Sequence, residues 1–238
     1  MVSEQYFHDI TALMNKVHTT QKEKMEKASR LVANTIENDG IIYIFGCGHS
    51  HLLSLDCFYR AGGLANVCAM LDTDLMLHNG AAKSSSMEKM PGIAKCIFER
   101  YCVTENDMMI VISTSGKNAV PVEMAKLAAE NKIPNFTICS SAYFAENKEM
   151  LYNCGDFYID NCVPKGDAIA AIPNCAVNMG SASTVIGSFL LQSILADGAE
   201  LAAKEGADVP IYKSGNVSGG SEYNKALIKR YYSRIKHL

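Results

Sequence analysis

The chain lacks both an excess of basic residues and a long apolar run. Its 22 lysines and arginines are outnumbered by 25 aspartates and glutamates, which gives a net charge of −3. A general nucleic-acid-binding protein needs a basic face, so this class is disfavoured. We see no apolar run that approaches the ~20 residues of a membrane span. The polar start, with Glu4, His8 and Asp9, does not resemble a signal peptide. We expect a cytoplasmic protein without a nucleic-acid or membrane partner.

The chain also lacks a C-x-x-C pair, although it contains nine cysteines. An odd number excludes a complete disulfide framework, and most of the cysteines lie in apolar segments. Reduced, buried thiols in a cytoplasmic protein fit this pattern better than a zinc site. We therefore predict no metal and no cofactor.

Strand-like and helix-like segments alternate along the chain. Before residue 40, apolar residues recur at helical spacing over 6–17 and 25–36, which predicts two amphipathic helices. Short apolar runs predict strands at 41–45, 67–71, 108–112, 136–139 and 156–159. Helices are predicted at 52–59, 90–101, 119–131, 148–154 and 185–203. This order predicts an α/β fold with a parallel sheet covered on both faces.

No linker, repeat or low-complexity tract divides the 238 residues. We expect one domain, with N-terminal helices over 1–39, an α/β core over 40–205 and a C-terminal tail over 206–238. The segments 72–86 and 161–180 show no periodicity, and the end of the tail is basic.

Residues 113–118 (Ser-Thr-Ser-Gly-Lys-Asn) form a polar loop between a predicted buried strand and a predicted helix. Asn118 stands at the N-cap position of that helix, and Pro121 falls in its first turn, where proline costs nothing. Free amides at a helix start, a glycine and three hydroxyl groups suit an anion. The simpler alternative is an ordinary strand–helix turn. The loop does not match the Walker A motif.

Residues 46–50 (Gly-Cys-Gly-His-Ser) form a second loop after a buried strand. Its G-x-G suggests dinucleotide binding, with Asp72 as the ribose-binding acid. However, His51 occupies the position of the third glycine, where a side chain would obstruct the helix–strand contact. A nicotinamide enzyme also leaves the loop at 113–118 without a role, so we disfavour it.

The two loops resemble those of sugar isomerase (SIS) domains. Residues 113–118 are similar to the Ser-x-Ser-Gly-x-[Ser/Thr] phosphate loop, and residues 46–50 to the Gly-x-Gly-x-Ser loop after the first strand. The resemblance covers about residues 3–205. It indicates a phosphosugar-binding branch related to phosphoheptose isomerases and N-acetylmuramic acid 6-phosphate etherases. The segments at 79–84 and 214–220 are features of that branch.

The resemblance implies a three-layer αβα sandwich with a flavodoxin-like sheet and a phosphorylated sugar as ligand. The residues it offers for binding are Ser50, Ser113, Thr114, Ser115, Gly116, Asn118, His49, Lys83, Ser183 and Thr184. Asn118 departs from the family pattern, which has a hydroxyl residue at that position.

The catalytic residues of the relatives are not retained. Their glutamate, ten residues after the loop serine, is Arg60 here, and arginine cannot act as a base. Asp56, one turn earlier, could replace it or could simply pair with Arg60. The last long helix also lacks the histidine of phosphoheptose isomerases and offers Ser183, Thr184 and Gln192.

We expect Glu88 as the general base and His78 as the general acid, because both lie in or beside the irregular segment 72–86. Lys83 lies in the same segment. The plain alternatives are that Glu88 caps a helix that follows Ser85 and that His78 only orders its loop. A metal site formed by His49, His51 and His78 is disfavoured, because i,i+2 spacing splays the first two rings apart.

The function expected from this pattern is binding of a phosphorylated sugar, with isomerase or ether/lyase-type chemistry on it. The alternative is a non-catalytic sugar-phosphate sensor or regulatory subunit. Only about 40 residues precede the first strand, and they contain no basic recognition helix, so direct transcriptional control is disfavoured. The broad apolar stripe of the first helix, and the assembly of SIS relatives, predict a homodimer or tetramer.

Overall fold

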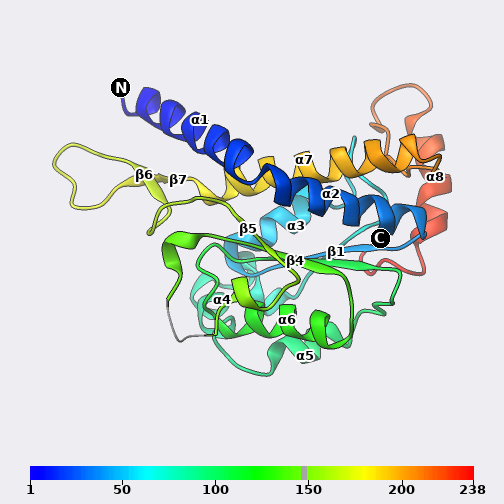
Figure 1. Ribbon diagram of the computed structural model, residues 1–238, viewed down its shortest axis with the longest axis horizontal. Helices are drawn as coiled ribbons and strands as arrows, with labels where there is room; N and C mark the ends of the chain where they lie inside the picture. Colours follow the sequence, from blue (N-terminus) through cyan, green and yellow to red (C-terminus); the bar gives the residue numbers. More distant parts are fainter. Residues whose placement is uncertain (146–148) are drawn as a thin grey trace.

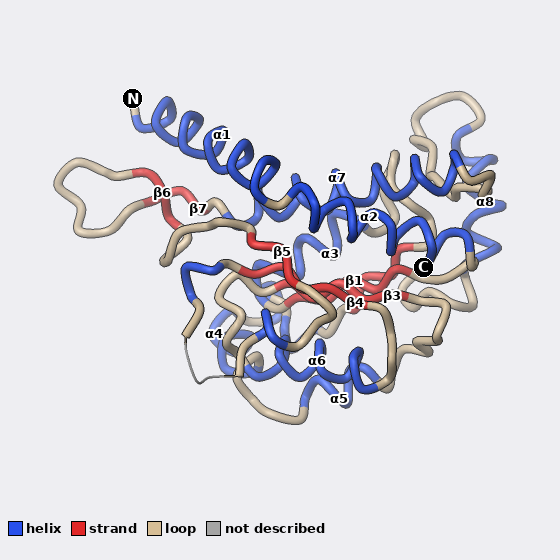
Figure 2. Tube along the Cα trace, in the orientation of Figure 1, coloured by secondary structure: helices blue, strands red, loops and turns tan. Residues whose placement is uncertain are grey.

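The computed structural model describes residues 1–145 and 149–238. Five parallel strands form the central sheet in the order β2-β1-β3-β4-β5 (Figures 1 and 2). Their bounds are β1 Ile42–Gly46, β2 Val67–Met70, β3 Met108–Ile112, β4 Asn135–Cys139 and β5 Tyr158–Asp160. All five predicted strands are present, and their order is that of the flavodoxin fold.

Helices cover both faces of the sheet. Their bounds are α1 Val2–Thr20, α2 Lys22–Glu37, α3 His51–Cys57, α4 Ala81–Met87, α5 Ile93–Phe98, α6 Ala119–Glu130, α7 Ser183–Lys204 and α8 Gly220–Tyr231. Figure 1 shows α2 and α7 on one side of the sheet and α5 and α6 on the other. The αβα class and the leading helices are as predicted.

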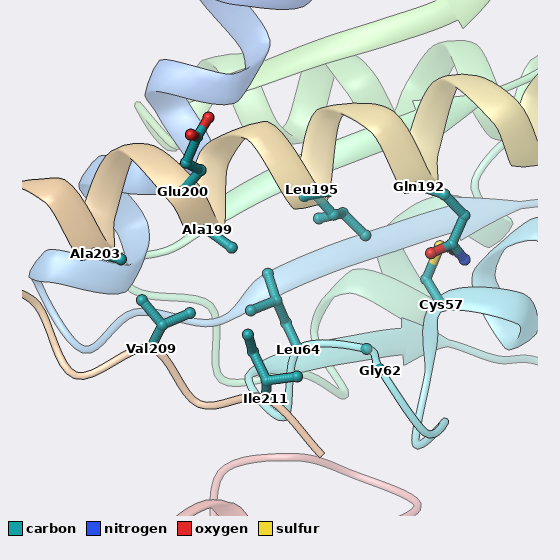
Figure 3. Close-up of a pocket in the computed structure, with 12 residues that line it drawn as sticks. Cys57, Gly62, Leu64, Gln192, Leu195, Ala199, Glu200, Ala203, Val209 and Ile211 are labelled. Carbon is teal, nitrogen blue, oxygen red and sulfur yellow. Dashed lines mark hydrogen bonds between the residues drawn. The ribbon is translucent and has the colours of Figure 1, made fainter. Parts of the chain in front are cut away.

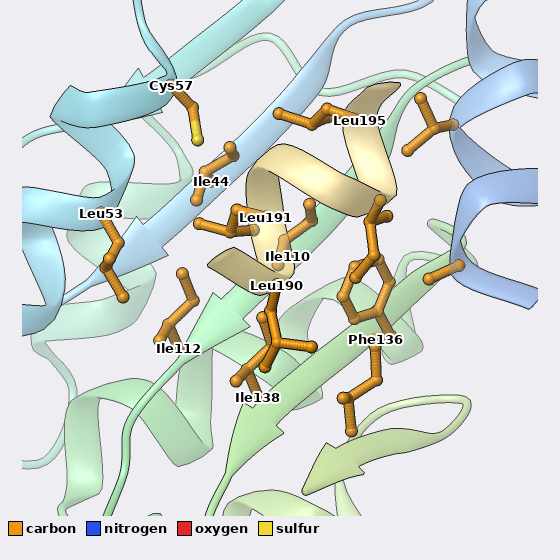
Figure 4. Close-up of a cluster of buried hydrophobic side chains, with 14 of the residues drawn as sticks. Ile44, Leu53, Cys57, Ile110, Ile112, Phe136, Ile138, Leu190, Leu191 and Leu195 are labelled. Carbon is orange, nitrogen blue, oxygen red and sulfur yellow. The ribbon is translucent and has the colours of Figure 1, made fainter. Parts of the chain in front are cut away.

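The core is split in two by the sheet because successive strand residues point to opposite faces. On one face, strand residues such as Ile44, Ile110 and Phe136 contact Leu190 and Leu191 of α7 (Figure 4). A second cluster on the other face joins alternate strand residues to α5, α6 and the chain end after α8. Strands β1 to β4 are therefore buried on both sides, as their apolar runs predict, whereas the edge strand β5 is only partly buried.

Helix α7 is an exception to the expectation that no segment of the chain approaches the length and apolarity of a membrane span. By length and composition alone, it is long and apolar enough to cross a membrane. Its buried residues nevertheless pack on the sheet in the larger core cluster. Helix α7 is therefore a core helix of this fold.

Several predicted boundaries are wrong. The segment 72–86 is not wholly irregular, because α4 lies in it, and 161–180 contains part of an antiparallel hairpin formed by β6 (Ala168–Ala170) and β7 (Met179–Ser181). The helix predicted over 90–101 begins only at Ile93, after Gly92, which has φ +87°. In place of the helix at 148–154 there is one 3₁₀ turn, Leu151–Asn153, and Lys148 lies outside the described residues.

The tail is more ordered than its polarity suggests. Helix α8 buries Tyr231, and Ile235 follows it into the core. At the other end, α1 projects beside the β6–β7 hairpin (Figure 1). The Tyr6 hydroxyl donates to the carbonyl of Ser181 at 2.7 Å. The Phe7 side chain on α1 is 63% exposed.

Candidate functional site

The two loops singled out in the sequence emerge side by side. Strands β1 and β3 are neighbours, and Gly46 is in register with Ile112 at their carboxyl ends. Strand β1 continues to β2 on one side and β3 to β4 on the other. This is the point at which the strand order reverses, where ligands bind in open parallel sheets.

The loop from Ser113 to Asn118 is open to an anion. Gly116 has φ +61°, a conformation that favours glycine, and its amide donates to the Ser113 hydroxyl at 3.2 Å. Within the described parts of the chain, the amides of Ser115, Lys117 and Asn118 have no hydrogen-bond acceptor. Helix α6 starts at the next residue and has no side-chain cap. Free amides followed by a helix N-terminus form a favourable environment for negative charge.

A small pocket joins both loops to the start of α7. Its lining residues are His49, Ser50, Leu53, Ile112, Thr114, Ile138, Asn161, Ser183, Thr184 and Gly187. Five of them are predicted binding residues. The open volume is only about 10 Å³, which is room for about one water molecule.

The N-terminus of α7 differs from that of α6, because a carboxylate occupies it. One Asp167 oxygen accepts from the amides of Ala182 at 3.0 Å and Ser183 at 2.7 Å. The other accepts from the Ser183 hydroxyl at 2.8 Å. Ser183 therefore lines the pocket with its hydroxyl already engaged.

Asn161, which follows β5, is a pocket residue that we did not select from the sequence. Its amide donates to the Thr114 hydroxyl at 3.2 Å, and its carbonyl oxygen accepts from the Val163 amide. Thr114 is thereby oriented from a loop 47 residues away. The available signal was position alone, since Asn161 is a polar residue directly after a strand.

Glu88 does not cap a following helix. It stands just after α4, and its carboxylate accepts from the Asn118 amide group at 2.7 Å. The Glu88 carbonyl also accepts from Val120 of α6 at 3.1 Å. The carboxyl is half-buried, and burial raises its pKa. Asn118 holds the N-cap position without capping the helix with its side chain.

The structure does not link Glu88, His78 and Lys83 directly. Lys83 pairs with Asp74 at 2.6 Å. His78 is exposed, and its ring centroid lies 6.0 Å from that of the buried His51. His51 binds the Gly48 carbonyl through Nδ1, while its buried Nε2 has no partner within the described structure. Burial lowers the His51 pKa, which favours the neutral ring.

At the position of the relatives' glutamate, Arg60 pairs with Asp56. The Asp56 carboxylate also accepts from Ser188 at 2.9 Å and from Gln192 at 3.0 Å, both on α7. Burial alone would raise its pKa, but these two hydrogen bonds and the Arg60 charge lower it. Asp56 is thus an ionised, fully engaged acceptor and a weak base.

Among the described residues, no three His, Cys, Asp or Glu side chains are arranged to hold a metal ion. A larger, mostly apolar groove of about 320 Å³ runs along α7, with Leu195, Ala199, Leu64 and Ile211 on its walls (Figure 3). None of the predicted binding residues lines it.

Comparison with known proteins supports the resemblance seen in the loops. The SIS domain family model matches residues 5–140. A UPF0309 protein of Geobacillus kaustophilus is 38% identical over 237 residues, covering 97% of this chain and 94% of its own. A UPF0309 protein of Listeria innocua is 40% identical over 234 residues, covering 95% of each.

Solved structures show the same fold. Phosphoheptose isomerase GmhA from Neisseria gonorrhoeae has a TM-score of 0.53 at 16% identity, covering 84% of this chain and 97% of that one. The Vibrio vulnificus NanR protein, solved with ManNAc-6P, has a TM-score of 0.52 at 13% identity, covering 98% and 68%. At such identities the likeness concerns the fold alone.

Proposed function

Because this chain belongs to the SIS-domain family, we propose that it binds a phosphorylated sugar on the loops that follow β1 and β3. The observation that carries this proposal is that the amides of Ser115, Lys117 and Asn118 have no acceptor in the described structure, just before a helix start without a side-chain cap. The proposed anchors are Ser50, Ser113, Thr114, Ser115, Gly116 and Asn118, with His49, Lys83, Ser183 and Thr184 around the sugar.

The phosphate alone gives limited affinity. A phosphate monoester carries about −1.5 to −2 charges at pH 7. Four hydrogen bonds to it, at roughly 1.5–3 kcal/mol each, contribute about 6–12 kcal/mol. The loss of freedom on association costs about 4–15 kcal/mol. The sugar must therefore add contacts of its own, and we propose that polar groups in the segments 72–86 and 161–183 provide them.

For turnover, we infer that Glu88 removes the proton next to the sugar carbonyl and that His78 serves the oxygen. The raised pKa of Glu88 makes it a better base than an exposed carboxylate. Its bond to Asn118 tethers it to the loop proposed to hold the phosphate. The two ring nitrogens of an imidazole such as that of His78 can donate or accept a proton. Isomerisation and ether elimination both begin with this proton abstraction.

The second candidate is a non-catalytic sensor. It is favoured by the Asp56 network, because the region that bears the relatives' glutamate holds only an arginine and a fully engaged carboxylate.

Solvent deuterium incorporation separates the two candidates. Sugar phosphates that shift the melting temperature are incubated with the protein in D₂O, and exchange at the carbon beside the carbonyl is followed by NMR. We expect exchange with the parent and at least a hundredfold slower exchange with Glu88→Gln. Glu130→Gln, at the far end of α6, is the control. Exchange at the parental rate in Glu88→Gln removes Glu88 from the mechanism, and no exchange in any protein supports the sensor.

We also propose that the chain forms at least a dimer through α1 and lies in the cytoplasm. Support for the dimer comes from the projecting helix and its exposed Phe7. The unpaired state of all nine cysteines supports a reducing compartment. Light scattering at micromolar concentration tests the dimer, and a monomeric mass would refute it.

A further inference from the structure

A second polar pocket lies at α8, apart from the loops that follow β1 and β3. It encloses about 400 Å³ between residues 59–61, the segment 212–215 and α8. Figure 1 shows α8 at the end of the molecule opposite to α1 and the β6–β7 hairpin. We call this cavity the α8 pocket. Its volume lies in the range of small-molecule sites, about 300–1,000 Å³.

The α8 pocket concentrates positive charge. Arg60, Lys213 and Lys225 line it, whereas its described lining contains no aspartate or glutamate. The chain as a whole has a net charge of −3, so the three cationic side chains make this pocket wall more positive than the average surface. An anionic ligand fits this wall.

Each cation can still engage a ligand. Arg60 binds Asp56 through Nη1, and its other two nitrogens have no partner in the described structure. The Lys213 ammonium lies 4.2 Å from the Tyr223 ring centroid, while Asn224 fixes the Lys213 backbone by two hydrogen bonds. Lys225 pairs with Glu222, but both side chains are at least 70% exposed, and such pairs contribute little.

A buried polar group in the same lining lacks a partner. Tyr212 is 4% exposed, and within the described structure its hydroxyl makes no hydrogen bond. Burial raises the Tyr212 pKa to about 12, so the hydroxyl stays protonated and can donate. Tyr212 therefore brings unused hydrogen-bonding capacity to the pocket lining.

The segment 214–220, to which the sequence analysis assigned no role, contains two glycines whose surroundings differ. A side chain at Gly220 would collide with the Ser214 carbonyl, so the fold requires glycine there. At Gly215 an added Cβ would meet only the Ser221 hydroxyl, at an ordinary 3.5 Å. Gly215 and Ser221 both line the pocket, so a methyl group would narrow the pocket and leave the backbone undisturbed.

The rim carries an aromatic ring. Tyr59 is 56% exposed and is held at φ +47°, a conformation that bulky residues rarely adopt. Its ring contacts Tyr212 edge to face, with centroids 5.3 Å apart. An exposed ring beside a basic wall suits a ligand with a flat aromatic part and a phosphate.

We propose that the α8 pocket binds a nucleoside phosphate, with the phosphates on Lys213, Lys225 and Arg60 and the base on Tyr59. This site is independent of the proposed phosphosugar site, with which it shares no lining residue.

Calorimetry on the full chain with ADP as the probe tests this assignment. Lys213→Ala and Gly215→Ala should each weaken ADP binding, the former at least tenfold because it removes a charge-assisted contact. Tyr59→Asn removes the ring but keeps a residue that tolerates the left-handed conformation, and it should lose about tenfold. Lys229→Ala, an exposed lysine on the same helix, is the matched control and should bind ADP like the parent.

Pyrophosphate and adenosine are the partial probes, and each should bind at least tenfold more weakly than ADP. Pyrophosphate binding as tight as ADP would overturn the nucleotide assignment. ADP binding that is absent at millimolar concentration, or unchanged in both Lys213→Ala and Gly215→Ala, would overturn the site. Loss of ADP binding in Ser115→Asp, with full binding in Lys213→Ala, would move ADP to the loop after β3 and also overturn the proposal.

Discussion

Helices α6 and α7 begin at the same edge of the sheet, but only the N-terminus of α7 is capped by a carboxylate from the described part of the chain. At α7, one carboxylate of Asp167 takes up two amides and a hydroxyl. At α6, the amides of Ser115, Lys117 and Asn118 in the preceding loop have no acceptor in the described structure, and the Asn118 side chain donates to Glu88. A helix start attracts negative charge in either case. The α7 start is neutralised by the protein, which leaves the α6 start for a ligand.

The largest effect should follow from placing a negatively charged side chain at the open N-terminus of α6. Ser115→Asp places a carboxylate among the free amides, where it competes with phosphate and repels it. Because like charges cost several kcal/mol, we expect sugar-phosphate affinity to fall by roughly a hundredfold or more. Calorimetry with a panel of hexose and heptose phosphates measures this loss. Ser233→Asp, beyond α8, carries the same charge change and should bind normally. Unchanged binding in Ser115→Asp would refute the open-terminus interpretation.

The next effect concerns stability at the occupied terminus. Asp167→Ala removes three hydrogen bonds and the charge at the start of α7, which should cost about 1–2 kcal/mol of unfolding free energy. For a chain of this length, each kcal/mol lowers the melting temperature by about 2–4 °C. Asp208→Ala, which removes an exposed pair with Arg230, is the control and should cost less than about 0.5 kcal/mol. Equal losses in the two variants would mean that Asp167 does not stabilise α7.

The open terminus could be predicted from the sequence because its parts are contiguous. A buried strand, a run of serines with Gly116 and a helical pattern follow one another, and the parallel sheet then aligns the loop with the one after β1. The five strands were predicted for the same reason, since each is a short continuous apolar run. In both cases, residues that are adjacent in the sequence form the feature, so the sequence pattern alone predicts it.

The occupied terminus could not be predicted, because its partners are distant in sequence. Asp167 lies 16 residues before Ser183, at the end of a loop whose path is set by tertiary packing. Asn161 reaches Thr114 across 47 residues, and Glu88 reaches Asn118 across 30. No periodicity encodes such pairs. The short helix α4 was missed because Ala81 to Met87 carries no apolar stripe, and tertiary contacts decide its fold.

A smaller effect is expected in the pH dependence of stability, to which Glu88 beside the α6 N-terminus contributes. Burial raises the Glu88 pKa above its ordinary value of 4.5. A carboxyl with a raised folded pKa contributes stability that is fully present below pH 4.5 and is lost as the pH rises through the folded pKa. Glu88→Gln cannot ionise, so the parent should lose stability relative to this variant as the pH rises above 4.5. Urea unfolding at a series of pH values from 4.5 upwards measures the difference, and parallel pH profiles would contradict the assigned shift.

The smallest effect should come from Ser183→Ala. The Ser183 hydroxyl lines the pocket, but it already donates to Asp167, so a phosphate would have to break that bond to use it. We expect sugar-phosphate affinity to change by less than about threefold, which is under about 0.7 kcal/mol. The same substitution in an Asp167→Ala background should cost more, because the hydroxyl is then free to donate to the ligand. The four proteins form a double-mutant cycle, and calorimetry gives the coupling between the two residues. A tenfold loss in the single Ser183→Ala variant would show that both helix termini hold the ligand, and the contrast between α6 and α7 would then be wrong.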